Sequence, residues 1–496
     1  MSQQCYIGTR TILKSDKDTI SNLQNVEVFG VQTEDRRKHF YILGKTGTGK
    51  TTLLTNMILQ DIYNGLGVCF IDPHGDSSEY ILDRIPPHRH KDVIYFNPAD
   101  IEYPIGLNIL ESQRGEAGFL ITSTLIAVFN KIWQGTWSSR MEYILSNTLL
   151  TLLENEGNTL LGVVKILTDE KYRRKIVARV NDPLVKNFWQ LEFAKFNEKY
   201  RQEAVAPILN KIGQFFSNEV IRNILGQSKS TIDFRDIMDN KKILIANLSK
   251  GRLGEENSDL LGSLLISKLQ IATMSRVDTP ENQRQDFYVY VDEFQNFTTD
   301  SFAGILSEAR KYRLNLILAH QYIAQLVESG TVKVKNAIFG NVGTIIAFRL
   351  GSSDAKEITN EFSQVIDADK LMNLQRSKVG VKLSTEGQLS KAFIASTLPP
   401  LFDQISGQLE TVVASSRKNY ARKRKAVREE IMTYLKEVDR PIDNLVKNKK
   451  PQFEINNKEQ VDSYLNTFLE QNSSKGQKPQ NSSNFKLDNV NIEIIT

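Results

Sequence analysis

Cysteine is scarce in this chain, whose 496 residues contain only Cys5 and Cys69. Two cysteines do not make a disulfide framework, so a reducing compartment is the default expectation. Histidine is also rare: there are five, they are scattered, and no C-x-x-C pair accompanies them. This pattern argues against a structural zinc site.

Long hydrophobic runs are missing as well. No apolar stretch approaches the roughly 18 residues that a membrane-spanning helix needs. The N-terminal residues Met1–Cys5 lack the basic and apolar regions of a signal peptide. With 40% hydrophobic and 24% charged residues, the composition is that of a soluble globular protein with room for more than one domain. We therefore expect a cytoplasmic protein.

The net charge of +5 is unevenly distributed. The stretch from Ser416 to Lys450 holds 12 Lys and Arg against 5 Asp and Glu, which is a net charge of +7, so the rest of the chain carries −2. The basic residues cluster in Arg417-Lys418 and Arg422–Lys425, within a stretch that reads as helical to about Lys436. Such a run is either a contact for nucleic acid or acidic lipid, or a solvated helix face.

A phosphate-loop motif is present over residues 44–51, with the sequence GKTGTGKT. The apolar run Phe40–Leu43 precedes it and a helix-like segment follows, which is the strand–turn–helix context of a G-x-x-x-x-G-K-[ST] loop rather than of an ordinary glycine-rich turn. Lys50 is expected to reach the β- and γ-phosphates of ATP, and the Thr51 hydroxyl to hold Mg²⁺. The expected nucleotide-binding residues are Gly44, Thr46, Gly47, Thr48, Gly49, Lys50, Thr51 and Thr52.

Short apolar strands alternate with helices around this loop, which predicts a parallel α/β sheet. The expected strands after the loop are 68–71, 93–96, 243–247, 287–291, 316–319 and 344–348, and 381–383 with 391–395 read as a terminal hairpin. Between the second and third of these, helical periodicity dominates over 120–133, 140–154, 160–166 and 198–216. An all-helical block therefore interrupts one nucleotide-binding domain.

An acidic pair follows the apolar strand at 287–291. Phosphate-loop enzymes need a second acidic position to hold the metal, on the strand beside the loop, and Asp292 supplies it. Glu293 is placed to act as general base toward the water that attacks the γ-phosphate. The alternative is a surface strand end that carries two acids.

Polar residues at further strand ends are candidates for catalysis. Gln321 is expected to lie between the attacking water and the γ-phosphate, whereas His320 is either a second candidate or a packing residue. A cation must neutralise charge in the transition state, and Arg349 is chosen over Arg310 and Arg313 because a strand end is a rigid mount.

The segment Asp72–Asp76, sequence DPHGD, follows the strand after the loop helix. Its Pro and Gly form a turn that either aims two carboxylates at the nucleotide cleft or a subunit interface, or is a plain strand-to-helix turn.

Together these motifs resemble the ring-forming DNA-pumping ATPases of the HerA/FtsK superfamily, and within it the TraG/TraD-type coupling proteins of conjugation and type IV secretion. The resemblance covers residues 26 to 405. It is carried by residues 41–51, 71–76, 96–98 with 106–108, 291–295 and 318–321.

The resemblance implies a RecA-like α/β domain with an inserted all-α domain, assembled as a homo-hexamer with ATP between subunits. The implied divisions are a β-rich lead-in (1–38), the first part of the RecA-like domain (39–110), the all-α insertion (111–235), the second part (236–405), a basic helical segment (406–450) and a disordered tail (451–496).

Coupling proteins usually begin with membrane-spanning helices, which this chain lacks. Either a membrane-anchoring partner of the secretion channel holds it at the inner membrane, or it is a soluble relative.

Three functional hypotheses remain. The first is an ATP- and Mg²⁺-dependent DNA translocase, whose cargo is DNA or a DNA–protein conjugate such as a relaxase. The second is a secretion ATPase that powers protein export or pilus assembly without DNA. The third is a nucleotide-switched cargo adaptor, against which an intact general base argues.

Overall fold

The computed structural model describes residues 4–12, 25–112, 117–299, 302–328 and 332–436, and the predicted tail lies outside them. Within this part of the chain, eleven strands form one sheet in the order β2-β1-β13-β10-β9-β3-β8-β7-β4-β6-β5. The strands are β1 (Gln4–Ile12), β2 (Asn25–Gln32), β3 (Phe40–Leu43), β4 (Gly67–Asp72), β5 (Val93–Phe96), β6 (Ile243–Asn247), β7 (Phe287–Val291), β8 (Leu314–His320), β9 (Thr344–Ala347), β10 (Lys378–Lys382) and β13 (Phe393–Thr397). A separate small hairpin pairs β11 (Ser384–Thr385) with β12 (Gln388–Leu389).

The strands from β9 to β5 are parallel and confirm the α/β prediction. They read as uninterrupted apolar runs because both faces of a parallel sheet are buried. Side chains alternate between the faces: Tyr41 and Leu43 enter one hydrophobic core, while Phe40 and Ile42 enter the other. The first core continues into the helices inserted between β5 and β6.

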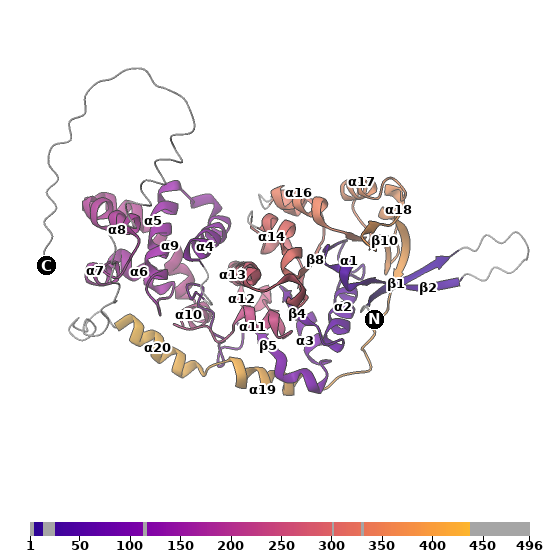
Figure 1. The fold of residues 1–496 in the computed structure, drawn as a ribbon, viewed down its shortest axis with the longest axis horizontal. Coiled ribbons are helices and arrows are strands. Elements are labelled where there is room, and N and C mark those ends of the chain that lie inside the picture. The colour runs from indigo at the N-terminus through magenta and orange to yellow at the C-terminus, as the bar shows by residue number, and fades with distance from the viewer. Residues whose placement is uncertain (1–3, 13–24, 113–116, 300–301, 329–331, 437–496) are drawn as a thin grey trace, which may run out of the picture. The chain divides into compact units, whose positions relative to one another are not determined.

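Helices cover both faces of the sheet (Figure 1). The helix after the phosphate loop, α2, ends at Tyr63, because Gly65 takes a left-handed φ of 72° that stops it. The helices around the sheet are α1 (Thr33–Arg36), α2 (Lys50–Tyr63), α3 (Asp76–Leu82), α12 (Lys250–Leu253), α13 (Glu255–Met274), α14 (Phe302–Glu308), α15 (Ala324–Glu328), α16 (Val332–Asn341), α17 (Ser352–Glu361) and α18 (Ala368–Met372).

The antiparallel edge of the sheet contains the predicted terminal hairpin, since β10 pairs with β13. The N-terminal strands continue that edge: β1 pairs with β13 and β2 pairs with β1. β1 and β2 are thus outer strands of the nucleotide-binding sheet.

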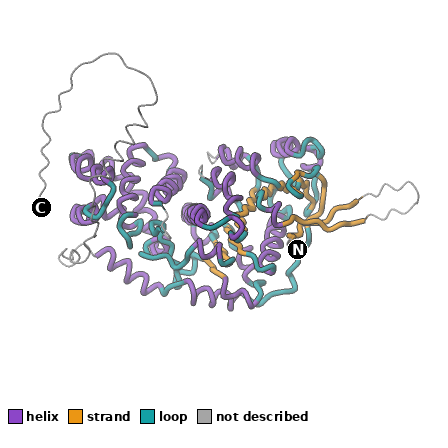
Figure 2. The backbone as a smooth tube through the Cα atoms, viewed as in Figure 1, coloured by secondary structure: helices purple, strands orange, loops and turns teal. Residues whose placement is uncertain are grey.

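The helices between β5 and β6, which we call the helical insertion, contain no strand within the residues that the structure describes (Figure 2). Asn and Asp N-caps define many of its helix starts; Asp169, Asp182, Asn197 and Asn218 each accept a hydrogen bond from the first turn. The four predicted helices are confirmed as α4 (Gly118–Ile132), α5 (Ser139–Leu153), α6 (Leu161–Thr168) and α9 (Glu198–Ser217). The helices that were not predicted are α7 (Glu170–Val177), α8 (Pro183–Asn187), α10 (Glu219–Leu225) and α11 (Phe234–Asp239). No helix in the described part of the chain is long and apolar enough to cross a membrane.

The basic C-terminal segment forms two helices, α19 (Leu409–Tyr420) and α20 (Arg424–Lys436), coloured yellow in Figure 1. Residues 421–423 break the helix that the sequence predicted as continuous. At this break Ala421 bridges to Ile105, and the backbone N–H of Arg422 donates to the carbonyl of Pro104 at 3.1 Å. Helix α19 lies against β5, whereas α20 packs on α10 of the helical insertion.

Candidate nucleotide-binding site

The phosphate loop connects β3 to α2 through a tight turn. Gly47 (φ 75°) and Gly49 (φ 119°) adopt backbone angles that favour glycine. A side chain at Gly44 has no room, because a Cβ there would lie 2.5 Å from the Cβ of Phe348. The Thr48 hydroxyl donates to the Lys45 carbonyl at 2.7 Å, so this side chain shapes the loop itself.

Lys50 begins α2 beneath the loop, and its ammonium donates to the carbonyl of Gly44. Burial lowers the pKa of Lys50, and the carboxylates of Glu293 and Asp292 oppose that shift. The loop thus presents a lysine close to two acids, in a turn whose backbone is held open for an anion.

The acidic pair lies directly after β7. Asp292 is 6% exposed, and its pKa is raised to about 6 by burial and by the neighbouring charges of Glu293 and Asp72. Glu293 takes a left-handed conformation (φ 46°, ψ 48°), which is costly for a residue with a side chain. Such strain in a cleft is typical of functional positions.

Two glutamine amides hold the Glu293 carboxylate. Gln321, just after β8, donates to Oε1 at 2.9 Å, and Gln295 donates to Oε2 at 2.9 Å. Gln321 was predicted from the sequence, whereas Gln295, which lies only two residues beyond the glutamate, was not. The glutamate is therefore fixed in orientation from two sides.

The sheet order corrects one expectation. Asp292 was predicted on the strand beside the loop, yet β8 lies between β3 and β7. The physical reason is that β8 pairs in parallel with both strands: Phe40 of β3 lies opposite Ile317, and Val291 of β7 lies opposite Leu318. Gln321, at the end of β8, thereby reaches Glu293.

One pocket of about 370 Å³ joins these groups. Thr51 and Asp292, the two residues expected to hold the metal, both line this pocket. A threonine hydroxyl and one carboxylate fit Mg²⁺, because this ion takes few ligands from the protein. The lining residues are Lys45, Thr46, Gly47, Gly49, Lys50, Thr51, Thr52, His74, Asp292, Glu293, Gln321 and Arg376.

The arginines near the pocket differ from the expectation. Arg349 lines an adjoining pocket of about 470 Å³ together with Lys45, Thr46 and Gln321. Arg376 lines the nucleotide pocket itself, and the neighbouring Ser377 donates its backbone N–H to the Thr48 carbonyl at 2.9 Å. No sequence motif marks Arg376; only the tertiary fold brings it to the loop. The other candidates, Arg310 and Arg313, lie before β8, at the opposite end of that strand from Gln321.

The contacts bear on two alternatives that the sequence left open. The Asp72 carboxylate accepts the backbone N–H groups of His74 and Ser78 at 2.9 Å, so it stabilises the strand-to-helix turn, and His74 of the same segment lines the pocket. A role of the exposed Asp76 at a subunit interface stays a prediction. His320 is fully buried and shares a hydrogen bond with the Tyr41 hydroxyl. Because burial lowers its pKa to about 3, His320 is a neutral packing residue.

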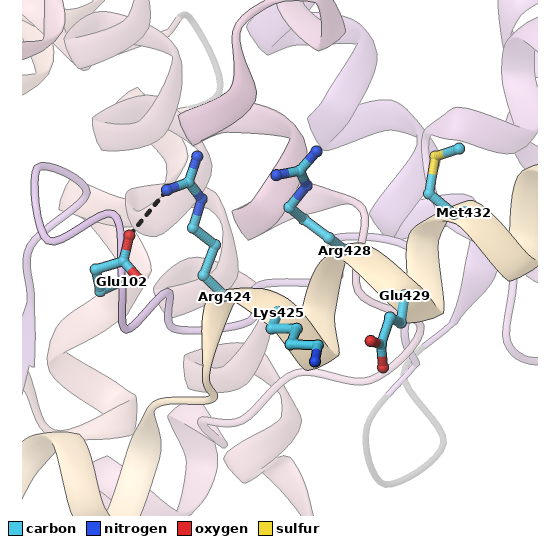
Figure 3. A pocket seen from close by; sticks show the side chains of 6 residues that line it. All are labelled: Glu102, Arg424, Lys425, Arg428, Glu429 and Met432. Atoms are coloured by element: carbon cyan, nitrogen blue, oxygen red, sulfur yellow. Dashed lines mark hydrogen bonds and ion pairs between the residues drawn. The ribbon is translucent and has the colours of Figure 1, made fainter.

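The basic C-terminal run is partly neutralised by ion pairs. Figure 3 shows Arg424 reaching Glu102, while the Lys425 side chain points away from that pair. The pairs are Arg417 with Asp100 (2.7 Å), Arg422 with Glu430 (2.5 Å), and Arg424 with Glu102 (2.8 Å) and Glu219 (2.9 Å). Arg417 and Arg424 therefore tie this segment to other parts of the chain. Lys418, Lys423 and Lys425 are exposed near the break between the two helices, and Arg428 and Lys436 are exposed farther along α20.

The structure combines a parallel sheet, a phosphate loop after β3, and an acidic pair after β7, which is separated from β3 by one strand. These features define a RecA-like P-loop nucleoside-triphosphatase fold. The family model for the type IV secretion-system coupling protein DNA-binding domain matches residues 27–385. The chain belongs to this family, as its motifs indicated.

The chain is also similar to individual proteins of known sequence. It is 20% identical to the type 4 coupling protein DotL of Legionella pneumophila over 84% of this chain and 61% of that protein, so it spans about three fifths of that relative's length. An uncharacterized protein of Mycoplasma pneumoniae is 29% identical over 26% of this chain and 82% of its own length.

Solved structures share the fold. The bacterial conjugative coupling protein TrwB, in a truncated unbound form, superposes with a TM-score of 0.56 at 15% identity, covering 76% of this chain and 88% of TrwB. TrwB in complex with ADP and Mg²⁺ superposes with a TM-score of 0.55 at 14% identity, covering 82% and 96%.

Proposed function

We propose that this protein is a Mg²⁺-dependent ATPase that drives DNA, or a DNA–protein conjugate, through a channel formed by a homo-hexamer. The observation that carries the proposal is the single pocket shared by the phosphate loop, Asp292, Glu293 and Gln321. A pure nucleotide-binding adaptor has no need of a glutamate held by two amides beside the phosphate loop.

Each residue has a role in this proposal. Backbone N–H groups of the loop and Lys50 bind the phosphates, and Thr51 and Asp292 hold Mg²⁺, which supplies charge neutralisation when bound. Glu293 accepts the proton of the attacking water, and Gln321 links that glutamate to the γ-phosphate. Arg349, which lies beside the phosphate loop of its own chain, neutralises transition-state charge, and Arg376 contacts the nucleotide.

The relatives support the choice of ligands. Structures of TrwB contain ADP with Mg²⁺ or a non-hydrolysable ATP analogue. Because this chain belongs to the coupling-protein family, we infer that it also binds ATP and Mg²⁺. The family's DNA-binding description supports DNA as a partner. A relaxase or other cargo protein and a membrane-anchoring channel partner complete the assembly, which places the protein in the cytoplasm at the inner membrane.

The test is steady-state ATPase activity of the purified protein with and without single- or double-stranded DNA, across a salt series. We expect DNA to stimulate turnover and salt to abolish the stimulation, because phosphate contacts weaken with salt. Activity indifferent to DNA would contradict the translocase and favour a secretion ATPase. Tight ATP binding without turnover would favour the switched adaptor.

A second prediction concerns three exposed lysines of the basic segment. In the triple variant Lys418→Gln/Lys423→Gln/Lys425→Gln, we expect weaker DNA binding. We also expect the slope of the logarithm of the binding constant against the logarithm of the salt concentration to become shallower by about 0.7 to 0.9 per lost phosphate contact. Fluorescence anisotropy with labelled DNA over a salt series measures this slope. The matched control replaces three exposed lysines of the helical insertion, Lys171, Lys195 and Lys199, by Gln. An unchanged slope in the first variant means that these three lysines do not touch DNA.

A further inference from the structure

Lys131 connects the helical insertion to the turn that follows the catalytic acids. It lies in the last turn of α4, and its ammonium donates to the backbone carbonyls of Gln295 (3.0 Å) and Asn296 (2.7 Å). These carbonyls belong to a short 3-10 turn, Phe294–Asn296, directly after Glu293. A positive charge at the carboxyl end of such a turn stabilises its outward carbonyl groups.

The same turn orients the general base. Gln295 is 7% exposed, and its side-chain amide donates to Glu293 Oε2 at 2.9 Å while its backbone carbonyl accepts from Lys131. One residue thus makes both contacts. A path of two hydrogen bonds runs from α4 to the carboxylate that receives the proton.

Helix α4 is anchored firmly within the helical insertion. Trp133, just beyond the helix, stacks on Phe129 at 4.7 Å and on Phe215 of α9 at 5.8 Å between ring centroids. On the other side, the turn after Glu293 lies close to α13, where a Cβ at Gly262 would lie 2.2 Å from the Phe297 ring. Helix α4 also packs on α13, so Lys131 lies where the insertion meets the sheet domain, and its acceptors belong to the sheet domain.

The ammonium group of Lys131 lies near other charged side chains in a buried setting. Burial lowers the pKa of Lys131 to about 7, with Asp259 of α13 opposing the shift and Lys250 of α12 adding to it. Asp259 is itself paired with Lys250 at 3.3 Å. Holding an ammonium group there carries a desolvation cost, which the charge-assisted bonds to two carbonyls offset.

We propose that Lys131 is a positioning residue that holds the turn carrying Gln295, and through it Glu293, so that ATP turnover depends on how the helical insertion sits against the sheet domain. This inference rests on the proposed ATPase function. It assigns to the insertion a direct mechanical connection to the general base.

The experiment compares steady-state ATPase kinetics of three variants with the wild type. We expect Lys131→Met to lower kcat roughly 10- to 100-fold, because a misplaced catalytic group loses that much, while KM for ATP stays close to wild type. Lys131→Arg keeps the charge and the donors and restores most of kcat. The matched control is Lys268→Met, since Lys268 of α13 is 3% exposed and donates at 2.8 Å to the carbonyl of Glu111, a residue outside the turn.

A wild-type kcat in Lys131→Met would overturn the proposal. An equal loss of kcat in Lys131→Met and Lys268→Met would overturn it too, because the loss would then come from disturbed packing in general. Should Lys131→Met fail to fold, the pH profile decides: wild-type kcat falls above pH 7 as Lys131 loses its proton, whereas Lys131→Arg shows no such fall. Identical profiles would contradict the proposal. DNA-independent turnover in the wild type would contradict only the translocase, and absent turnover would overturn both.

Discussion

Replacing Glu293 by Gln is expected to leave ATP bound and to lower kcat about 10²- to 10⁴-fold, the usual contribution of a general base. The amide cannot accept the proton of the attacking water, and it removes one of the two oxygens to which Gln295 and Gln321 donate. Isothermal titration with ATP reports binding, and steady-state phosphate release reports turnover. Unaltered binding with lost turnover separates the chemical step from nucleotide affinity.

The matched control for this variant is Glu308→Gln, which changes the charge equally at an exposed position on α14. It should retain wild-type kcat. Turnover at the wild-type rate in Glu293→Gln would remove Glu293 from the role of base. Loss of ATP binding in the same variant would instead make it a residue of the binding site.

Replacing Asp61 by Asn is expected to lower the free energy of unfolding by about 3–5 kcal/mol, the cost of leaving a buried charge without its partner. Asp61 is fully buried on α2 and makes a bidentate ion pair with Arg36 at 2.6 and 2.7 Å. The Tyr290 hydroxyl donates to the same carboxylate at 2.6 Å, and Arg36 stacks on Tyr288 at 3.8 Å. Chemical denaturation followed by circular dichroism measures the change.

Two comparisons make this result specific. Glu27→Gln breaks the exposed pair with Arg10, whose side chains are 48% and 43% exposed, and should cost less than about 1 kcal/mol. The double variant Arg36→Met/Asp61→Leu removes both buried charges and should recover much of the stability lost in Asp61→Asn. A loss for Asp61→Asn no larger than that for Glu27→Gln would show that the buried network contributes little.

This network also explains how the fold supports the site. Arg36 comes from α1, Asp61 from the helix that begins at Lys50, and Tyr290 from the strand that delivers Asp292. The network therefore joins α1, which follows β2, to the helix after the phosphate loop and to the strand that precedes the acidic pair. Its effect on stability and its effect on activity should appear together.

Much of the site was predictable because its chemistry is local in sequence. The phosphate loop sets its own turn through Gly47 and Gly49, and strand β7 delivers Asp292 and Glu293 as one unit. Strands and long helices were predictable from runs and periods of apolar residues. Helices α7, α8, α10 and α11 were missed because five to eight residues give little periodicity, and α6, of eight residues, was found because it is almost wholly apolar.

Other features depend on chain segments far apart. Arg376 belongs to no sequence motif, yet it lines the nucleotide pocket. The sequence of the basic run also does not show that Arg417 and Arg424 form ion pairs with Asp100, Glu102 and Glu219. Likewise, nothing in the α4 sequence indicated that Lys131 ends beside the Glu293 turn, 164 residues away from Gln295.

The sequence by itself determined that this chain binds phosphate groups at a strand–loop–helix unit, that an acidic pair follows a buried strand, and that a helical block divides the sheet. These properties follow from glycine's backbone freedom and from apolar periodicity, which act over a few residues. The tertiary structure alone decided that β8 separates β3 from β7, that two glutamines orient Glu293, and that most arginines of the basic run are paired. Those outcomes depend on which distant strands pair and which side chains meet across the fold, and no local pattern encodes such contacts.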